Sequence, residues 1–367
     1  MIRYLSWEKT ITTCTLACLI SFSFSYPRNS LADTLVVFNW EDYLSDEVIA
    51  RWEKKSGHKI KQIYYDGNEN RDSVLVAIGN DTTEIDILIA DETATPSFGT
   101  IGTLLSVNAY ESTPNIHLVD KKWDKVCGAY GVPYLWGTLG VAYRSDKVTS
   151  APTSWDILFN PPPLLSGHIG WLDESIDTLA PALFLANNDI NTRDPDTLRA
   201  AFEKTKRALP HILTFQYSLS YLDSSVRQIS KPAEKELYLA MSYSGDQDSL
   251  NEQSGTDLWQ YTTLDEGTIS WVDCLAVLKN SSRKALAFDF INFLYQPENA
   301  AQNSLDAYTA TPMSQAKSLQ PIDFQNDSTV YPGDTLDRSQ PYLPMDNATA
   351  VLRRRITSTL EKLHESK

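Results

Sequence analysis

The sequence predicts an α/β protein in which short apolar strands alternate with helices. Apolar runs of strand length occur at 34–38, 59–65 and 85–90, and the segments between them have the spacing of helices. This order of strands and helices is typical of a parallel sheet covered by helices. With 367 residues, 42% of them hydrophobic, the chain can form one large or two medium domains of roughly 100–200 residues each.

The first helix is expected over 46–55, where Val48, Ile49 and Trp52 recur at helical spacing and Ser45 can act as the N-cap. A second helix is expected around 71–79. Farther along, the patterns predict strands at 139–143, 169–172, 237–242 and 268–277, and helices at 179–187, 197–208, 284–295 and 348–364. No long flexible linker interrupts this order, so two lobes joined by crossing strands fit better than two separate domains joined by a linker.

Aromatic residues beside carboxylates recur along the chain. Trp40 and Tyr43 flank Glu41 and Asp42, and this segment follows the first predicted strand. Residues 91–93 follow the third predicted strand in the same way. Ligands usually bind at the carboxyl ends of parallel strands, so we expect both segments to line a ligand site.

Two further places in the sequence repeat this pattern. Trp271 precedes Asp273 by two residues, and Tyr243 precedes Asp246 by three. Aromatic faces attract cations, and carboxylates accept charge-assisted hydrogen bonds from ammonium groups. Trp40 and Trp271 can instead be core aromatics, and Asp42 and Asp273 can be a helix cap and a partner of an internal arginine. The combination favours a site for a flexible organic cation.

Composition excludes several other functions. The net charge is −15, which argues against nucleic-acid binding. The five histidines lack metal-ligand spacing, and no nucleophile elbow, phosphate-binding loop or dinucleotide motif is present, so we expect no metal, no cofactor and no enzyme. Glu174 and Asp177 could serve as the acid and base of a glycosidase, or as acidic residues at a helix start.

The amino terminus is typical of an export signal. Arg3 and Lys9 precede an uncharged, mostly apolar stretch, and Ala32 ends a small-residue cleavage motif. We therefore expect residues 1–32 to be a cleaved signal peptide and the mature chain to be periplasmic. Lipidation at Cys18 and an uncleaved anchor are alternatives. Cys127 and Cys274 would be the only mature cysteines, and they can form a disulfide or remain separate buried thiols.

The whole chain from about residue 34 resembles the periplasmic spermidine/putrescine-binding proteins of ABC transporters. The motifs that carry this resemblance are residues 39–43, 132–137, 153–155, 271–273 and 291–294 with Pro297. The family implies a type II periplasmic binding protein fold, in which two α/β lobes close on a ligand cleft. On this basis we expect 33–143 and about 273–316 to form lobe 1, and 144–272 and about 317–367 to form lobe 2.

The resemblance also implies roles for particular residues. Those expected to contact the polyamine are Trp40, Glu41, Asp42, Tyr43, Asp91, Thr93, Glu174, Asp177, Tyr243, Asp246, Trp271, Asp273 and Tyr308. Several depart from the family pattern: the acid types at Glu174 and Asp177 are exchanged, Tyr243 replaces a tryptophan, and Asp91 and Thr93 replace a serine and a tyrosine. An extra acid at Asp91 could favour a more highly charged amine.

The resemblance implies a monomer whose partners are a polyamine and an inner-membrane ABC permease. Two other functions stay open at this point. One is a two-lobe carrier of a different small solute, and the other is a receptor that senses polyamines without transporting them.

Overall fold

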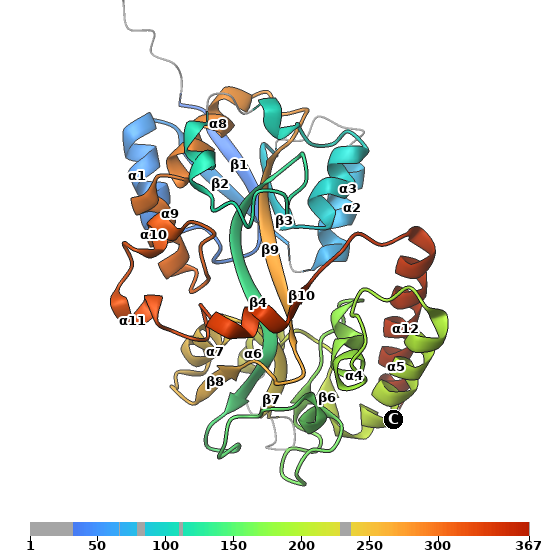
Figure 1. Cartoon of the computed structure of the whole chain (residues 1–367). Helices are drawn as coiled ribbons and strands as arrows, with labels where there is room; N and C mark the ends of the chain where they lie inside the picture. Colours follow the sequence, from blue (N-terminus) through green and yellow to red (C-terminus); the bar gives the residue numbers. More distant parts are fainter. Residues whose placement is uncertain (1–31, 66, 79–84, 110–112, 228–235, 367) are drawn as a thin grey trace, which may run out of the picture.

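A computed structural model describes residues 32–65, 67–78, 85–109, 113–227 and 236–366. Ten strands of this described part form one sheet, in which eight follow the order β2-β1-β3-β9-β4-β7-β5-β6, while β10 pairs with β9 and β8 with β4 (Figure 1). Helices surround both halves of the sheet, which confirms the predicted α/β class. The predicted signal peptide, with Cys18, lies outside the described residues except for Ala32.

The first half of the sheet begins with parallel strands. Strand β1 (Thr34–Asn39) lies between β2 (Lys59–Tyr64) and β3 (Ile87–Asp91). The helices of this half are α1 (Asp46–Ser56), α2 (Asn68–Ile78) and α3 (Ala94–Thr100). Ser45 caps α1 as predicted, since its hydroxyl accepts a hydrogen bond from the Val48 N–H.

Two long antiparallel strands join the halves of the molecule. Strands β4 (Val132–Arg144) and β9 (Thr268–Val277) pair along much of their lengths and run from one group of helices to the other (Figure 1). Leu135 of β4 packs in the core formed around β1 and β3, while Leu139 packs in the core formed around β5 and β7. We call these the first core and the second core. The predicted crossing strands are therefore β4 and β9.

The second half contains β5 (Ile169–Gly170), β6 (Ile212–Thr214), β7 (Leu239–Tyr243) and β8 (Trp259–Thr262). Its helices are α4 (Ala180–Leu185), α5 (Pro195–Ala208), α6 (Ser218–Arg227) and α7 (Asp246–Ser254). The second core lies between this part of the sheet and the helices.

After β9 the chain returns to the first core through α8 (Lys284–Leu294), α9 (Pro297–Asp306), α10 (Ser314–Lys317) and α11 (Ile322–Gln325). Strand β10 (Ser339–Pro341) then pairs with β9, and α12 (Asn347–Glu365) packs on the second core (Figure 1). Phe324 and Val330 still belong to the first core. The exact lobe boundaries stay a prediction.

Short 3-10 turns occur at η1 (Val107–Ala109), η2 (Pro114–Leu118), η3 (Trp155–Leu158), η4 (Asp177–Leu179), η5 (Leu209–His211) and η7 (Gly333–Arg338).

Cys127 and Cys274 form a disulfide whose Cα atoms lie 5.7 Å apart. The bond ties the segment before β4 to β9, and Cys274 directly follows Asp273. Of the two states that the sequence left open, the structure therefore has the paired one. None of the helices in the described ranges is both long and apolar enough to cross a membrane.

Candidate functional site

Two carboxylates face each other where β3 and β9 pair. The antiparallel register places Asp91 directly opposite Asp273. Side chains that are directly opposite in such a pair lie on the same face of the sheet, and like charges there are unfavourable unless other groups compensate them. The surroundings of the two acids differ, and this difference separates their roles.

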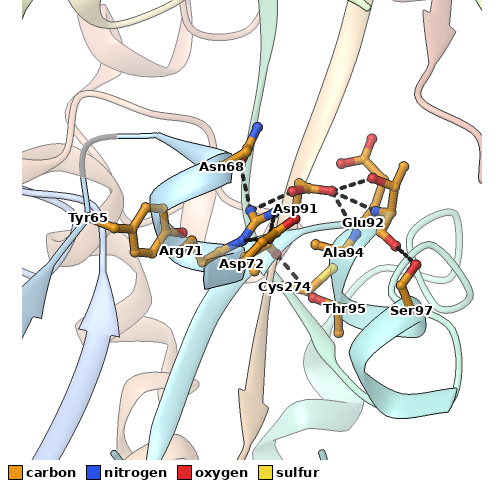
Figure 2. A network of polar contacts seen from close by, with 12 residues as sticks. Tyr65, Asn68, Arg71, Asp72, Asp91, Glu92, Ala94, Thr95, Ser97 and Cys274 are labelled. Atoms are coloured by element: carbon orange, nitrogen blue, oxygen red, sulfur yellow. Dashed lines mark hydrogen bonds and ion pairs between the residues drawn. The ribbon is translucent and has the colours of Figure 1, made fainter. Parts of the chain in front are cut away.

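Asp91 is compensated by the chain itself, as Figure 2 shows. Arg71 of α2 is buried and places Nη1 2.7 Å from Asp91 Oδ2, while the backbone N–H groups of Thr93 and Ala94 donate to Oδ1 at 2.9 and 2.8 Å. Burial alone would raise the pKa of Asp91, but Arg71 and these donors hold it below its usual value. Asp91 is therefore not a free additional carboxylate. Thr93 lies beside it and donates its hydroxyl hydrogen to Oδ1.

Asp273 has no such cation in contact with it in the part of the chain that the structure describes. Its side chain is buried, and burial raises its pKa to about 7, although the neighbouring Tyr43 hydroxyl opposes this shift. The charge of Arg71 also lowers the pKa of Asp273, but this is the smallest of the named effects. Arg71 forms its ion pair with Asp91 instead. Asp273 is therefore a buried acid whose ionised form needs another positive charge.

A second buried acid belongs to the other half of the molecule. Asp177 begins η4, and its two oxygens accept hydrogen bonds from the hydroxyl groups of Tyr243 at 2.6 Å and Tyr342 at 2.5 Å. Burial raises the pKa of Asp177 to about 6, while the two phenols and the more distant Arg353 oppose the shift. Tyr342 comes from the segment between β10 and α12, far from Asp177 in sequence.

Glu174 lies next to Asp177 and contacts the opposite half. Its Oε1 is 3.5 Å from the backbone nitrogen of Asn68, the first residue of α2. Burial raises the pKa of Glu174 to about 7, and the charge of Asp177 adds to this effect. The contact brings a second-half carboxylate next to the helix that carries Arg71, so the two halves meet at this site.

Asp246 begins α7 directly after Gly245, which has a φ of 102°. Its oxygens accept hydrogen bonds from Tyr217 Oη at 2.7 Å, Ser242 Oγ at 2.9 Å and the Tyr243 backbone N–H at 2.8 Å. Burial raises its pKa to about 6 against the effect of these donors. A positive φ favours glycine, so Gly245 permits the sharp turn that brings Asp246 back toward β7.

Aromatic rings accompany these acids. The rings of Tyr243 and Trp271 lie 6.2 Å apart at 82°, and those of Trp40 and Tyr65 lie 4.4 Å apart. Trp271 is only 8% exposed, and its Nε1 has no hydrogen-bond partner among the described residues. Trp40, in contrast, is half-buried against the strands of the first half.

Three predicted site residues have other surroundings than the buried acids. Glu41 and Asp42 are exposed, and their charges act on the half-exposed Tyr64. Tyr308 is half-buried, donates its hydroxyl hydrogen to Asp327 at 2.7 Å and packs against Phe324. Their predicted roles as ligand contacts stay predictions.

Several residues of this region were not predicted from the sequence: Tyr65, Asn68, Arg71, Glu92, Tyr217, Tyr342 and Arg353. They reach the site from six different parts of the chain, and no local motif marks them. Only Glu92 could have been suspected, because it lies between Asp91 and Thr93.

The described part of the site has one electrostatic property in common. Glu174, Asp177, Asp246 and Asp273 all have raised pKa values, and none of them takes part in a salt bridge within the described residues. Within those residues no group of histidines, cysteines and acids is arranged to hold a metal ion. Buried carboxylates next to aromatic rings are suited to an organic cation.

Comparison with known proteins places the chain in a family. The family model described as bacterial extracellular solute-binding protein matches residues 47–332. The chain belongs to this family. Its solved relatives also share the fold: a spermidine/putrescine ABC transporter substrate-binding protein from Streptococcus pneumoniae superposes with a TM-score of 0.75 at 22% identity, covering 91% of this chain and 100% of that one.

Individual relatives of this solute-binding protein differ in what their names describe. The norspermidine sensor of Vibrio cholerae is 32% identical over 334 residues, covering 91% of this chain and 90% of that protein. The spermidine/putrescine-binding periplasmic protein of Escherichia coli is 26% identical over 305 residues, covering 82% and 83%. The family resemblance and the two-lobe fold predicted from the sequence are thereby confirmed.

Proposed function

We propose that this solute-binding protein binds a polyamine in the periplasm and delivers it to an ABC importer, without converting it chemically. The observation that carries the proposal is a set of four acids with raised pKa values and no salt bridge within the described residues: Asp177 and Asp273, which are buried, and Glu174 and Asp246, which are half-buried. The names of the relatives support the same ligand class.

The chemistry of a polyamine matches these groups. Its amines titrate near the value of lysine, about 10.4, so they are protonated at neutral pH. Asp273 would hold an ammonium group on the side of the first core and Asp177 one on the side of the second, by charge-assisted hydrogen bonds. Trp271 and Tyr243 would cover the methylene chain between them, and their faces would attract the charges.

Binding would also favour a closed arrangement of the two halves. Glu174 contacts α2, and Tyr342 joins Asp177 from the segment that crosses between the halves. A ligand that bridges Asp177 and Asp273 contributes free energy only when both halves surround it. The equilibrium therefore shifts toward closure, which a permease can recognise.

Calorimetric titration of the protein purified after export, freed of bound amines, tests the ligand class. Putrescine, spermidine, norspermidine and spermine are titrated separately at low salt. Saturable one-to-one binding of at least one of them is expected. A folded sample that gives no heat with any of the four contradicts the proposal and leaves a carrier of another solute.

Delivery needs a separate test, because the 32% identical relative is named a sensor. Uptake of labelled polyamine is compared in cells with the gene, without it, and with an Asp273→Ala variant. We expect uptake to depend on the gene and on Asp273. Polyamine binding without any effect on uptake contradicts delivery and favours a sensing receptor.

A further inference from the structure

Glu92 is a buried acid of the same region that no prediction from the sequence assigned to the ligand. It directly follows β3 and is only 4% exposed. One oxygen, Oε2, accepts a hydrogen bond from the Val272 backbone N–H at 3.1 Å. The other oxygen, Oε1, is buried and has no hydrogen-bond partner among the described residues. Such a group is costly to bury without a partner.

The position of Glu92 relates it to both ends of the proposed site. Glu92 accepts its hydrogen bond from the backbone N–H of Val272, which stands between Trp271 and Asp273. Burial raises the pKa of Glu92 well above its usual value, and the charges of Asp91 and Asp273 add to this shift. In the other direction, burial and Asp177 raise the pKa of Tyr342, and Glu92 contributes to that shift too.

Tyr342 is the phenol that donates to Asp177. Glu92 therefore interacts electrostatically with Asp273 on one side and, on the other, with Tyr342, which donates its hydrogen bond to Asp177. Its neighbour Asp91 is ion-paired with Arg71 (Figure 2), so Arg71 compensates Asp91 and forms no salt bridge with Glu92 within the described ranges. Among the described residues, Glu92 has a backbone donor but no cation in contact with it.

We propose that Glu92 contacts the ligand and selects amines that carry a third positive charge between their two ends. This inference rests on the proposed function, in which Asp273 and Asp177 hold the terminal ammonium groups. A secondary ammonium in the middle of a triamine is then placed to donate to the free oxygen of Glu92. A diamine would present methylene groups there and leave the carboxylate without a cation.

The test combines one substitution with one change in the ligand. Spermidine is compared with 1,8-diaminooctane, which has the same chain length but a methylene in place of the middle nitrogen. Glu92→Gln retains an oxygen for the Val272 N–H and removes the charge. Both ligands are titrated into the wild-type protein and into this variant, so that the four affinities form a double-mutant cycle.

We expect the wild-type protein to prefer spermidine by about tenfold or more, because a charge-assisted hydrogen bond is made only with the triamine. Glu92→Gln should remove most of this preference by weakening spermidine binding, and should change diaminooctane binding by less than about threefold. Glu203→Gln, on an exposed turn of α5, serves as the matched control and should leave all affinities unchanged.

The possible results separate this inference from the proposed function. If the wild-type protein binds polyamines but does not distinguish the two ligands, the role of Glu92 is wrong while the function stands. The same holds if Glu92→Gln weakens both ligands equally or neither. If the wild-type protein binds neither ligand nor any other polyamine, the proposed function itself is wrong. Should Glu92→Gln fail to fold, the wild-type preference and a Glu92→Asp variant decide the question in the same way.

Discussion

Asp273 is the single residue from which we expect the largest contribution to ligand binding. Its buried carboxyl faces Asp91, and Arg71 is ion-paired with Asp91. We expect Asp273→Ala to weaken polyamine binding by roughly 2 kcal/mol or more, since the ligand ammonium would be left without its charged partner. Calorimetry of the variant and the wild-type protein at the same pH and salt measures this loss.

Asp196→Ala is the control for Asp273→Ala, because Asp196 is exposed on α5 and its ion pair is with Arg199 of the same helix. It should leave the affinity unchanged. An Asp273 variant that folds and binds as tightly as the wild-type protein would remove Asp273 from the site.

At the residue scale, the sequence predicted the acids better than their partners. Asp246 and Asp273 follow aromatic residues in short motifs, and Asp177 follows Glu174 by three residues. In the structure Asp177 and Asp273 are buried and Asp246 is half-buried. Tyr342 was not predicted, because it reaches Asp177 from 165 positions away. Such a contact depends on how β10 and α12 pack, and no local pattern records it.

Strand β4 shows the same limit at the scale of an element. The sequence predicted a strand only at 139–143, whereas the strand starts at Val132. Its residues are buried almost throughout, so alternation is absent, and Pro133 and Gly137 resemble breaks in the strand pattern. Strand β9, which contains neither proline nor glycine, was predicted with the bounds that it has, Thr268–Val277.

Position 137 of β4 has no room for a side chain, because Trp271 of the paired strand β9 lies against it. A Cβ atom at this position would lie 2.4 Å from Trp271 Cζ2 and 2.3 Å from Ser244 Oγ. We expect Gly137→Ala to displace the Trp271 ring, to lower the free energy of unfolding by about 1–3 kcal/mol and to weaken ligand binding. Denaturant unfolding and calorimetry measure the two effects.

Gly67→Ala is the matched control for Gly137→Ala, because a Cβ at Gly67 meets no atom within 4 Å. Its stability should remain within about 0.5 kcal/mol of the wild type. If Gly137→Ala has equally small effects, the Trp271 ring is not held by the close approach of β4.

At the scale of the whole molecule, the disulfide closes a long loop of the chain. Cys127 and Cys274 are separated by 147 positions, so the bond restricts the unfolded chain strongly. We expect the Cys127→Ser/Cys274→Ser double variant to lose about 2–5 kcal/mol in the free energy of unfolding. Denaturant unfolding of the oxidised wild type and the double variant measures the difference, and a loss below about 1 kcal/mol would show that the bond contributes little.

Four acids of the site should make the stability of the ligand-free protein depend on pH. Folding raises the pKa of Asp273 and Glu174 to about 7, and of Asp177 and Asp246 to about 6. Their unfolded values are about 4, so between these limits the folded state binds more protons than the unfolded state. The contribution of these four acids to stability therefore falls as the pH rises from about 4 to 7. Acids with lowered pKa values, such as Asp91, titrate below this window.

A bound polyamine should oppose this loss of stability, because its positive charges stabilise the ionised carboxylates. We expect the melting temperature of the ligand-free protein to fall between pH 5 and pH 8, and the increase caused by saturating spermidine to become larger over the same range. Binding at pH 6 should release protons, so the calorimetric enthalpy should differ between two buffers of different ionisation enthalpy. A ligand-free protein that becomes more stable toward pH 8, with no dependence of the enthalpy on the buffer, would mean that these acids are already paired within the chain. The cation site would then have to lie elsewhere, since a buried acid with an internal partner has no unmet charge to offer a ligand.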